Sequence, residues 1–141
     1  MRICAVELKS NEAIICILAL EKGLFNVPDC RARKLTLTDI QGTKALHAFQ
    51  SEFAKLLSDY QVDKVVIRER PTKGKFAGSS AGFKMEAAIQ LIDGADAQVV
   101  TNTAIKESLK RTPLEVSTKD VGLKQFQEAA FTTGFAFLNA K

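Results

Sequence analysis

Three extended stretches joined by short polar turns open the chain, and this arrangement constrains its fold more than any other feature. Apolar and β-branched residues dominate residues 2–8 and 13–20, with only the polar sequence KSNE between them. Residues 31–39 then alternate polar with apolar side chains, which is typical of a half-exposed strand. Because short turns join antiparallel strands, this part of the chain predicts a three-stranded meander.

The hydrophobic period changes after these strands. Within residues 42–60, apolar side chains recur every three or four residues, which predicts an amphipathic helix. The positions that set this period are Leu46, Phe49, Phe53, Leu56 and Tyr60. Strand-like and helix-like segments then alternate. They are strands at 64–69 and 97–100, a helix capped by Ser79 or Ser80 that ends before DGAD, a short helix at 102–111, and a last helix at about 119–139.

Strands reached through a helix add to a sheet in parallel, through right-handed crossovers. The element order therefore predicts an α/β fold with a five-stranded mixed sheet. Three antiparallel strands are followed by two parallel ones, and helices cover both faces. This is the element order of the ribonuclease H-like fold. No internal repeat or linker divides the chain, so we expect a single domain over residues 1–141.

The composition fits one ordinary globular domain, with 141 residues of which 46% are hydrophobic. No apolar run reaches about 18 residues, which predicts no membrane span. The first residues lack the apolar region of a signal peptide, so we expect a cytoplasmic protein. Cys4, Cys16 and Cys30 have no CxxC spacing and are expected to be reduced thiols. The net charge of +4 permits an anionic partner without requiring one.

Three glutamates stand where the predicted elements could bring them together. Glu7 closes the first apolar run, and Glu69 closes the strand at 64–69. If these strands are neighbours, both carboxylates reach one site, and Glu128 lies at the edge of the apolar arc of the last helix. Oxygen ligands suit Mg²⁺ or Mn²⁺, and two such ions can hold a phosphodiester for hydrolysis. Taken singly, each glutamate is more often a solvated residue, so both interpretations stay open.

A basic loop follows the fourth predicted strand. Arg68 and Arg70 begin it, and Lys73, Lys75 and Phe76 lie within it. Cationic side chains contact phosphates, and an aromatic ring can stack on a base. The loop therefore predicts a nucleic-acid contact, with a solvated loop as the alternative. Its glycines do not match the nucleotide-binding P-loop pattern.

The stretch ERPTKGKFAGSSAGFKMEAA, which begins at Glu69, resembles the second motif of bacterial Holliday-junction resolvases of the RuvC type. There a strand ends in a catalytic glutamate, and a basic loop and a Ser-initiated helix follow. The sequence ICAVELKS resembles the first motif, with Glu7 in place of an essential aspartate. The sequence QEAAFTTGFAFL resembles the last helix, with Glu128 at the first of two acidic positions. The resemblance implies a ribonuclease H-like nuclease whose catalytic and metal-binding residues are Glu7, Glu69 and Glu128, with Mg²⁺ or Mn²⁺ as cofactor.

Two further segments resemble the region that supplies DNA-contacting lysines in that family. They are AIKESL, which contains Lys106, and STKD, which contains Lys119. The resemblance thus implies structured DNA or RNA as the partner, and it is compatible with a homodimer. The whole sequence also resembles a small bacterial family of unknown function.

The chain departs from the resolvase pattern in four respects. The glycines that follow the first acidic residue in that family are missing from LKSNEA. Glu7 is one methylene longer than the family's aspartate, and Phe131 stands at the second acidic position of the last helix. Thr72 replaces a stacking aromatic residue, for which Phe76 is the candidate substitute. Two hypotheses remain. One is a metal-dependent phosphodiesterase acting on structured nucleic acid. The other is a catalytically inactive ribonuclease H-like domain that binds nucleic acid or a protein partner.

Overall fold

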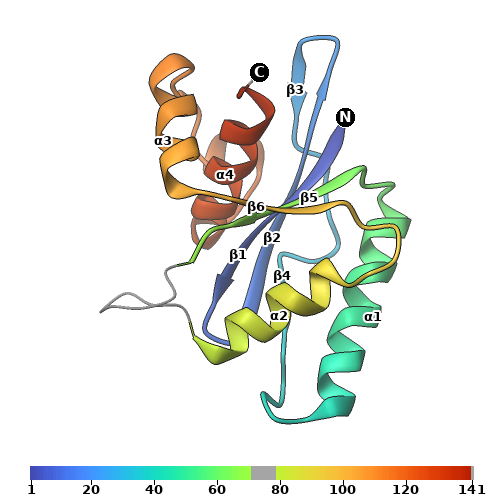
Figure 1. Cartoon of the computed structure of the whole chain (residues 1–141). Coiled ribbons are helices and arrows are strands. Elements are labelled where there is room, and N and C mark those ends of the chain that lie inside the picture. The colour runs from blue at the N-terminus through green and yellow to red at the C-terminus, as the bar shows by residue number, and fades with distance from the viewer. Residues whose placement is uncertain (71–78, 141) are drawn as a thin grey trace.

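The computed structural model describes residues 1–70 and 79–140 and has one mixed sheet between two layers of helices (Figure 1). The strands are β1 (Arg2–Lys9), β2 (Glu12–Glu21), β3 (Leu24–Asn26), β4 (Lys34–Thr36), β5 (Lys64–Arg68) and β6 (Ala97–Val100). The helices are α1 (Thr43–Asp59), α2 (Ser80–Gln90), α3 (Asn102–Arg111) and α4 (Glu128–Leu138), and the short 3₁₀ turns η1 (Lys119–Val121) and η2 (Gln125–Gln127) precede α4.

The strand β1 lies at the centre of the sheet. It pairs antiparallel with β2 on one side and parallel with β5 on the other, and β6 extends the sheet in parallel beside β5. The order across the sheet is β3-β2-β1-β5-β6, with β4 also paired to β2. This confirms the predicted mixed sheet, in which antiparallel strands come first and two parallel strands follow.

The third predicted strand differs from the structure, because two short strands lie beside β2 where one strand was expected. The strand β3 pairs with the second half of β2, and β4 pairs with the first half. The strand expected at 31–39 is therefore only 3 residues long, and the described sheet has 6 strands in place of five. Pro28 lies in the interruption and lacks the N–H that a ladder hydrogen bond requires.

Each face of the sheet has its own helices and its own apolar core, as predicted. Successive residues of a strand point to opposite faces. Cys4 and Val6 of β1 therefore pack in the core that α1 and α2 cover, whereas Ile3 and Ala5 pack in the core under α4. The helix α3 lies against α4 in that second layer (Figure 1). Among the described residues, no helix combines the length and the apolar character needed to cross a bilayer.

Two of the three cysteines are buried within the sheet. Cys4 and Cys16 belong to the cores on its opposite faces, and Cys30 is half-buried. Burial, with a smaller contribution from Cys30, raises the pKa of Cys16 to about 12. All three cysteines are unpaired in the structure.

The last helix begins at Glu128, later than the hydrophobic period predicts. Gly122 has a φ of +79°, in the left-handed region that glycine adopts readily, and the chain turns there. The two 3₁₀ turns η1 and η2 therefore replace the first part of the expected helix. The shift matters for the site because it makes Glu128 the exposed first residue of α4.

The gap between β3 and β4 is filled by a side chain from near the end of the chain. The amide Nε2 of Gln127 donates to the carbonyl of Ile15 in β2 at 2.8 Å, and Gln127 is only 2% exposed. Its Oε1 accepts from the backbone N–H of Lys124 at 2.9 Å. Gln127 thus satisfies a backbone acceptor of β2 that the interrupted third strand leaves without a ladder partner.

A glycine allows α4 to approach the sheet closely. A Cβ built on Gly134 would lie 2.7 Å from Cδ1 of Leu18 and 3.0 Å from the Cβ of Ala5. Real Cβ atoms do not come this close to carbon, so a larger residue here would require Leu18 or the helix to move. The contact sets the depth at which α4 packs on β1 and β2.

Replacing Gly134 with alanine should destabilise the fold by about 1–3 kcal/mol, because the new methyl group overpacks the contact with Leu18 and Ala5. Urea denaturation measures this change in the free energy of unfolding. Leu18→Ala opens space for the methyl group, so the double variant should be more stable than the sum of the two single losses predicts. Strictly additive losses would show that this contact does not fix the helix.

Gln127→Leu should also destabilise the fold, by about 1–3 kcal/mol, because it leaves the buried carbonyl of Ile15 without its donor. Gln125→Leu on the same 3₁₀ turn is the matched control. Gln125 is exposed, so its replacement should change the free energy of unfolding by less than about 0.5 kcal/mol. Equal effects of the two substitutions would contradict the proposed role of the buried amide.

Candidate functional site

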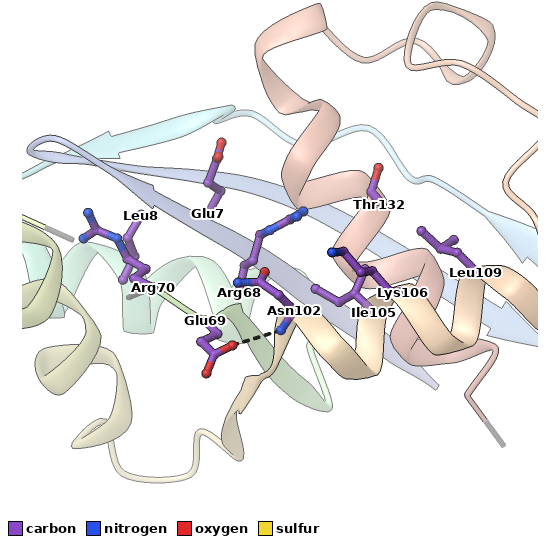
Figure 2. Close-up of a pocket in the computed structure, with 10 residues that line it drawn as sticks. All are labelled: Glu7, Leu8, Arg68, Glu69, Arg70, Asn102, Ile105, Lys106, Leu109 and Thr132. Carbon is purple, nitrogen blue, oxygen red and sulfur yellow. Dashed lines mark hydrogen bonds between the residues drawn. The ribbon is translucent and has the colours of Figure 1, made fainter. Parts of the chain in front are cut away.

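A pocket of about 500 Å³ opens where β1 and β5 end and α3 begins (Figure 2). Its lining residues are Glu7, Leu8, Arg68, Glu69, Arg70, Asn102, Ile105, Lys106, Leu109 and Thr132. In α/β proteins, ligands commonly bind at the carboxyl ends of parallel strands, which is where this pocket lies. The pocket brings together two predicted carboxylates, Glu7 and Glu69, and the predicted cations Arg68, Arg70 and Lys106.

Glu7 and Arg68 project from neighbouring strands on the same side of the sheet. The parallel register pairs Val6 with Ile67, so Glu7 and Arg68 occupy the next position along the two strands. Because side chains alternate, both lie on the face covered by α4. Figure 2 shows the Arg68 side chain between Glu7 and Thr132 of α4. Its Nη1 donates to the carbonyl of Ala129 at 3.5 Å.

Glu69 lies past the end of β5 and accepts a hydrogen bond from the start of α3. Its Oε1 accepts from the backbone N–H of Asn102 at 3.0 Å, and its own N–H donates to the carbonyl of Val100 at 2.9 Å. A carboxylate at a helix N-terminus satisfies an unpaired N–H and interacts favourably with the helix dipole. Figure 2 shows Glu69 directed away from Glu7, toward this junction. The Glu69 carboxylate therefore has a structural role whatever else it does.

Arg70 folds back onto the first turn of α2. Its guanidinium carbon lies 5.5 Å from the centre of the Phe83 ring, and it passes directly over Gly82, where any Cβ would overlap Nη1. Burial lowers the pKa of Arg70, and the carboxylates of Glu86 and Glu7 oppose that shift. Burial likewise raises the pKa of Glu86. Among the described residues, Arg70 Nη1 has no hydrogen-bond partner.

The structure adds two polar residues that sequence reasoning missed. Asn102 begins α3 directly after its capping residue Thr101, whose hydroxyl accepts from the N–H of Ala104 at 3.1 Å. Thr132 comes from α4, one helical turn after Glu128. The Thr101 cap was visible in the sequence as a threonine ahead of a helical period, and it could have indicated Asn102. Nothing in the sequence indicates which face of α4 turns toward the pocket.

Glu128 does not share this pocket. It is exposed and lines a second pocket of about 250 Å³, together with Phe131 and residues of the segment before η1. Thr132 lines both pockets, so the α4 position that faces Glu7 is a neutral threonine. Phe131 is a core residue, 1% exposed, whose ring centre lies 6.2 Å from that of Phe25.

The remaining predicted contacts fall elsewhere. Lys119 is exposed on η1 and does not line the pocket at the ends of β1 and β5. Lys73, Lys75 and Phe76 lie outside the described residues, as does Thr72. Of the two predicted caps for α2, Ser79 is the one used, since its hydroxyl accepts from the N–H of Gly82 at 3.0 Å.

The described donor set does not fit a two-ion metal site. Within residues 1–70 and 79–140, no three His, Cys, Asp or Glu side chains are grouped so that they could hold a metal ion. Mg²⁺ requires a near-octahedral set of oxygen ligands. Here Glu7 has the cationic Arg68 beside it, and Glu69 accepts a helix N–H instead. The structure thus brings two of the three predicted carboxylates to one pocket without assembling the predicted metal site.

The charge of the pocket favours an anion. Arg68, Arg70 and Lys106 contribute three positive charges against the two carboxylates of Glu7 and Glu69. Arginine offers a planar set of donors that suits the oxygens of a phosphate, and lysine adds a point charge. An anionic group with several oxygens is therefore the ligand class that this arrangement can hold.

Comparison with solved structures shows the fold. The structure of Thermus thermophilus RuvC is similar with a TM-score of 0.74 at 10% identity, over 99% of this chain and 94% of that one. T. thermophilus RuvC in complex with Holliday junction substrate gives a TM-score of 0.69 at 13% identity, with coverage of 99% and 94%. The fowlpox virus Holliday junction resolvase gives 0.56 at 11% identity, over the whole of both chains. No curated protein sequence matches the chain.

The topology and these structural similarities confirm the predicted ribonuclease H-like fold, in the form found in RuvC-type resolvases. The model of one protein family matches residues 1–137, which is nearly the whole chain. This chain, with its ribonuclease H-like fold and its basic pocket at the ends of β1 and β5, belongs to the family described as "Protein of unknown function (DUF3010)".

Proposed function

We propose that the chain is a nucleic-acid-binding protein that holds a phosphate backbone in the pocket at the ends of β1 and β5. The observation that carries the proposal is the gathering of Arg68, Arg70 and Lys106 in one pocket of about 500 Å³. One of the two carboxylates there, Glu69, already accepts a hydrogen bond from α3. Phosphate contacts supply most of the affinity in nucleic-acid binding, so a pocket with excess positive charge suits this ligand.

One observation supports structured nucleic acid, such as a branched DNA, as the form that binds, and a second supports a contact by the segment beside the pocket. The similar RuvC structure is of a complex with Holliday junction substrate. In this chain, the basic segment 71–78 is bounded by Arg70, which lines the pocket, and by Ser79, whose hydroxyl donates to the carbonyl of Ser10 at 3.0 Å. We therefore retain Lys73, Lys75 and Phe76 as proposed contacts to backbone and base, and Lys119 as a more distant one.

Phosphodiester cleavage is the second candidate function. The observation in its favour is that Glu7 and Glu69 line the same pocket as the cations. Against it stands the donor set, because the α4 residue in this pocket is Thr132 and Glu128 lines the adjoining one. The pocket therefore supports binding better than metal-assisted hydrolysis.

Binding should be measured by fluorescence anisotropy with a four-way junction, duplex DNA, an RNA–DNA hybrid and single strands, over a range of salt concentrations. We expect affinity to fall with salt, and Lys106→Ala to reduce the slope by about 0.9 log units per log unit of salt on duplex sites. Lys110→Ala is the matched control, since Lys110 is exposed on the same helix and does not line the pocket. If no nucleic acid shows salt-sensitive binding, the proposal fails and a protein partner becomes the better hypothesis.

Glu7→Gln distinguishes binding from metal-dependent chemistry. In a basic pocket that holds phosphate directly, loss of this carboxylate removes a repulsion, so binding should tighten several-fold, with effects on the order of 1 kcal/mol. Glu52→Gln, an exposed change on α1 at the other face of the sheet, should leave affinity unchanged. The same proteins should leave each nucleic acid intact when incubated with Mg²⁺ or Mn²⁺. Cleavage that is lost in Glu7→Gln and Glu69→Gln would establish the second candidate instead.

A further inference from the structure

We infer that the guanidinium of Arg68 supplies the positive charge that a divalent ion would otherwise bring to this pocket, so that phosphate binding needs no metal. The inference rests on the proposed function and deepens it, because it states how the same pocket recognises its ligand. It follows from where Arg68 lies, from what surrounds it, and from the donors that it leaves available.

The parallel register determines the position of Arg68. Val6 of β1 is opposite Ile67 of β5, and the next position places Glu7 beside Arg68. Neighbouring strands lie about 4.8 Å apart, and side chains at matched positions point to the same face. The Arg68 side chain therefore enters the space between the Glu7 carboxylate and α4, as Figure 2 shows. A cation that used Glu7 as a ligand would occupy this space and would meet the guanidinium at close range.

The surroundings of Arg68 contain few groups that could serve as ligands for a metal ion. On the α4 side, the pocket residue is Thr132, and the carbonyl of Ala129 accepts from Arg68 Nη1 at 3.5 Å. The second carboxylate of the pocket, Glu69, accepts from the N–H of Asn102 at 3.0 Å and points away from Glu7. Glu7 is thus a single carboxylate with a cationic side chain at the matching position of the next strand, and the two together have little net charge to attract a divalent ion.

The donors of Arg68 remain available to a ligand. Among the described residues, none of the ion pairs involves Arg68, and its side chain donates the long hydrogen bond to the carbonyl of Ala129. A guanidinium has five N–H donors in a planar arrangement and binds phosphate through two parallel hydrogen bonds. Arg68 therefore both compensates Glu7 and presents donors to a phosphate oxygen, with Lys106 of α3 lining the same pocket.

The substitution Arg68→Met tests this role, because it removes the charge and keeps a side chain of similar length. Mn²⁺ binding is followed by calorimetry and by the electron paramagnetic resonance of free Mn²⁺, without any nucleic acid present. We expect the variant to bind Mn²⁺ at least about tenfold more tightly than the wild-type chain, since a nearby like charge has been removed. Arg111→Met, the same change in the last turn of α3, should gain nothing.

Nucleic-acid binding provides the second measurement. The affinity of the wild-type chain for the four-way junction should be the same within about twofold in EDTA and in Mg²⁺ at matched ionic strength. Arg68→Met should bind at least about tenfold more weakly in EDTA, and Mn²⁺ should restore part of that loss. Arg68→Lys keeps the charge, and it should retain metal-independent binding. Thermal melting of each variant identifies any that fail to fold.

The outcomes separate this inference from the proposed function. Equal Mn²⁺ binding by the wild-type chain and Arg68→Met, or loss of wild-type junction binding in EDTA, overturns the inference and leaves the proposed function standing. If the wild-type chain binds no nucleic acid but Arg68→Met gains a Mn²⁺ site, the proposed function is wrong, and Arg68 is still the residue that excludes the metal.

Discussion

The parallel register between β1 and β5 is the contact on which the pocket depends. It pairs Val6 with Ile67 and so carries Glu7 and Arg68 to one face and to one level of the sheet. A shift of one residue would turn one of these two side chains to the opposite face. The register is well specified, because both strands are buried on both faces and contribute to both apolar cores. The packing of the core thus sets the electrostatics of the site.

The pocket differs from a carboxylate metal site in the charge of the residues that its fold brings together. Its two acidic residues have different neighbours, since Glu7 lies beside Arg68 and Glu69 accepts a hydrogen bond from the start of α3. On the other side, Arg70 rests against Phe83 and occupies the space directly over Gly82. Cationic side chains therefore occupy space on both sides of the strands.

Local patterns in the sequence were sufficient to predict much of the fold. The period-two runs, the helical period around Phe53 and the crossover rule predicted the sheet, its strand directions and the helices on both faces. They also predicted that Glu7 and Glu69 lie at the ends of neighbouring strands. What they missed depends on distant contacts. The strand β3 is too short to show a pattern. The side of α4 that faces the pocket, with Thr132 in place of Glu128, depends on how the helix packs on the sheet.

The bond from Gln127 to Ile15 joins residues 112 positions apart, and it has a consequence for how the chain reaches its native state. During synthesis from the N-terminus, β1, β2 and β5 can pair long before α4 exists. Until the last residues emerge, the sheet face that α4 covers and the short stretch of β2 between its pairings with β3 and β4 remain exposed to water and to other chains. Non-local contacts of this kind slow folding, because the long loop between them must close first. A nascent chain that pauses before Gln127 is therefore prone to aggregate. Synthesis of the last residues lets α4 cover the apolar face and lets Gln127 bond to the free carbonyl of Ile15.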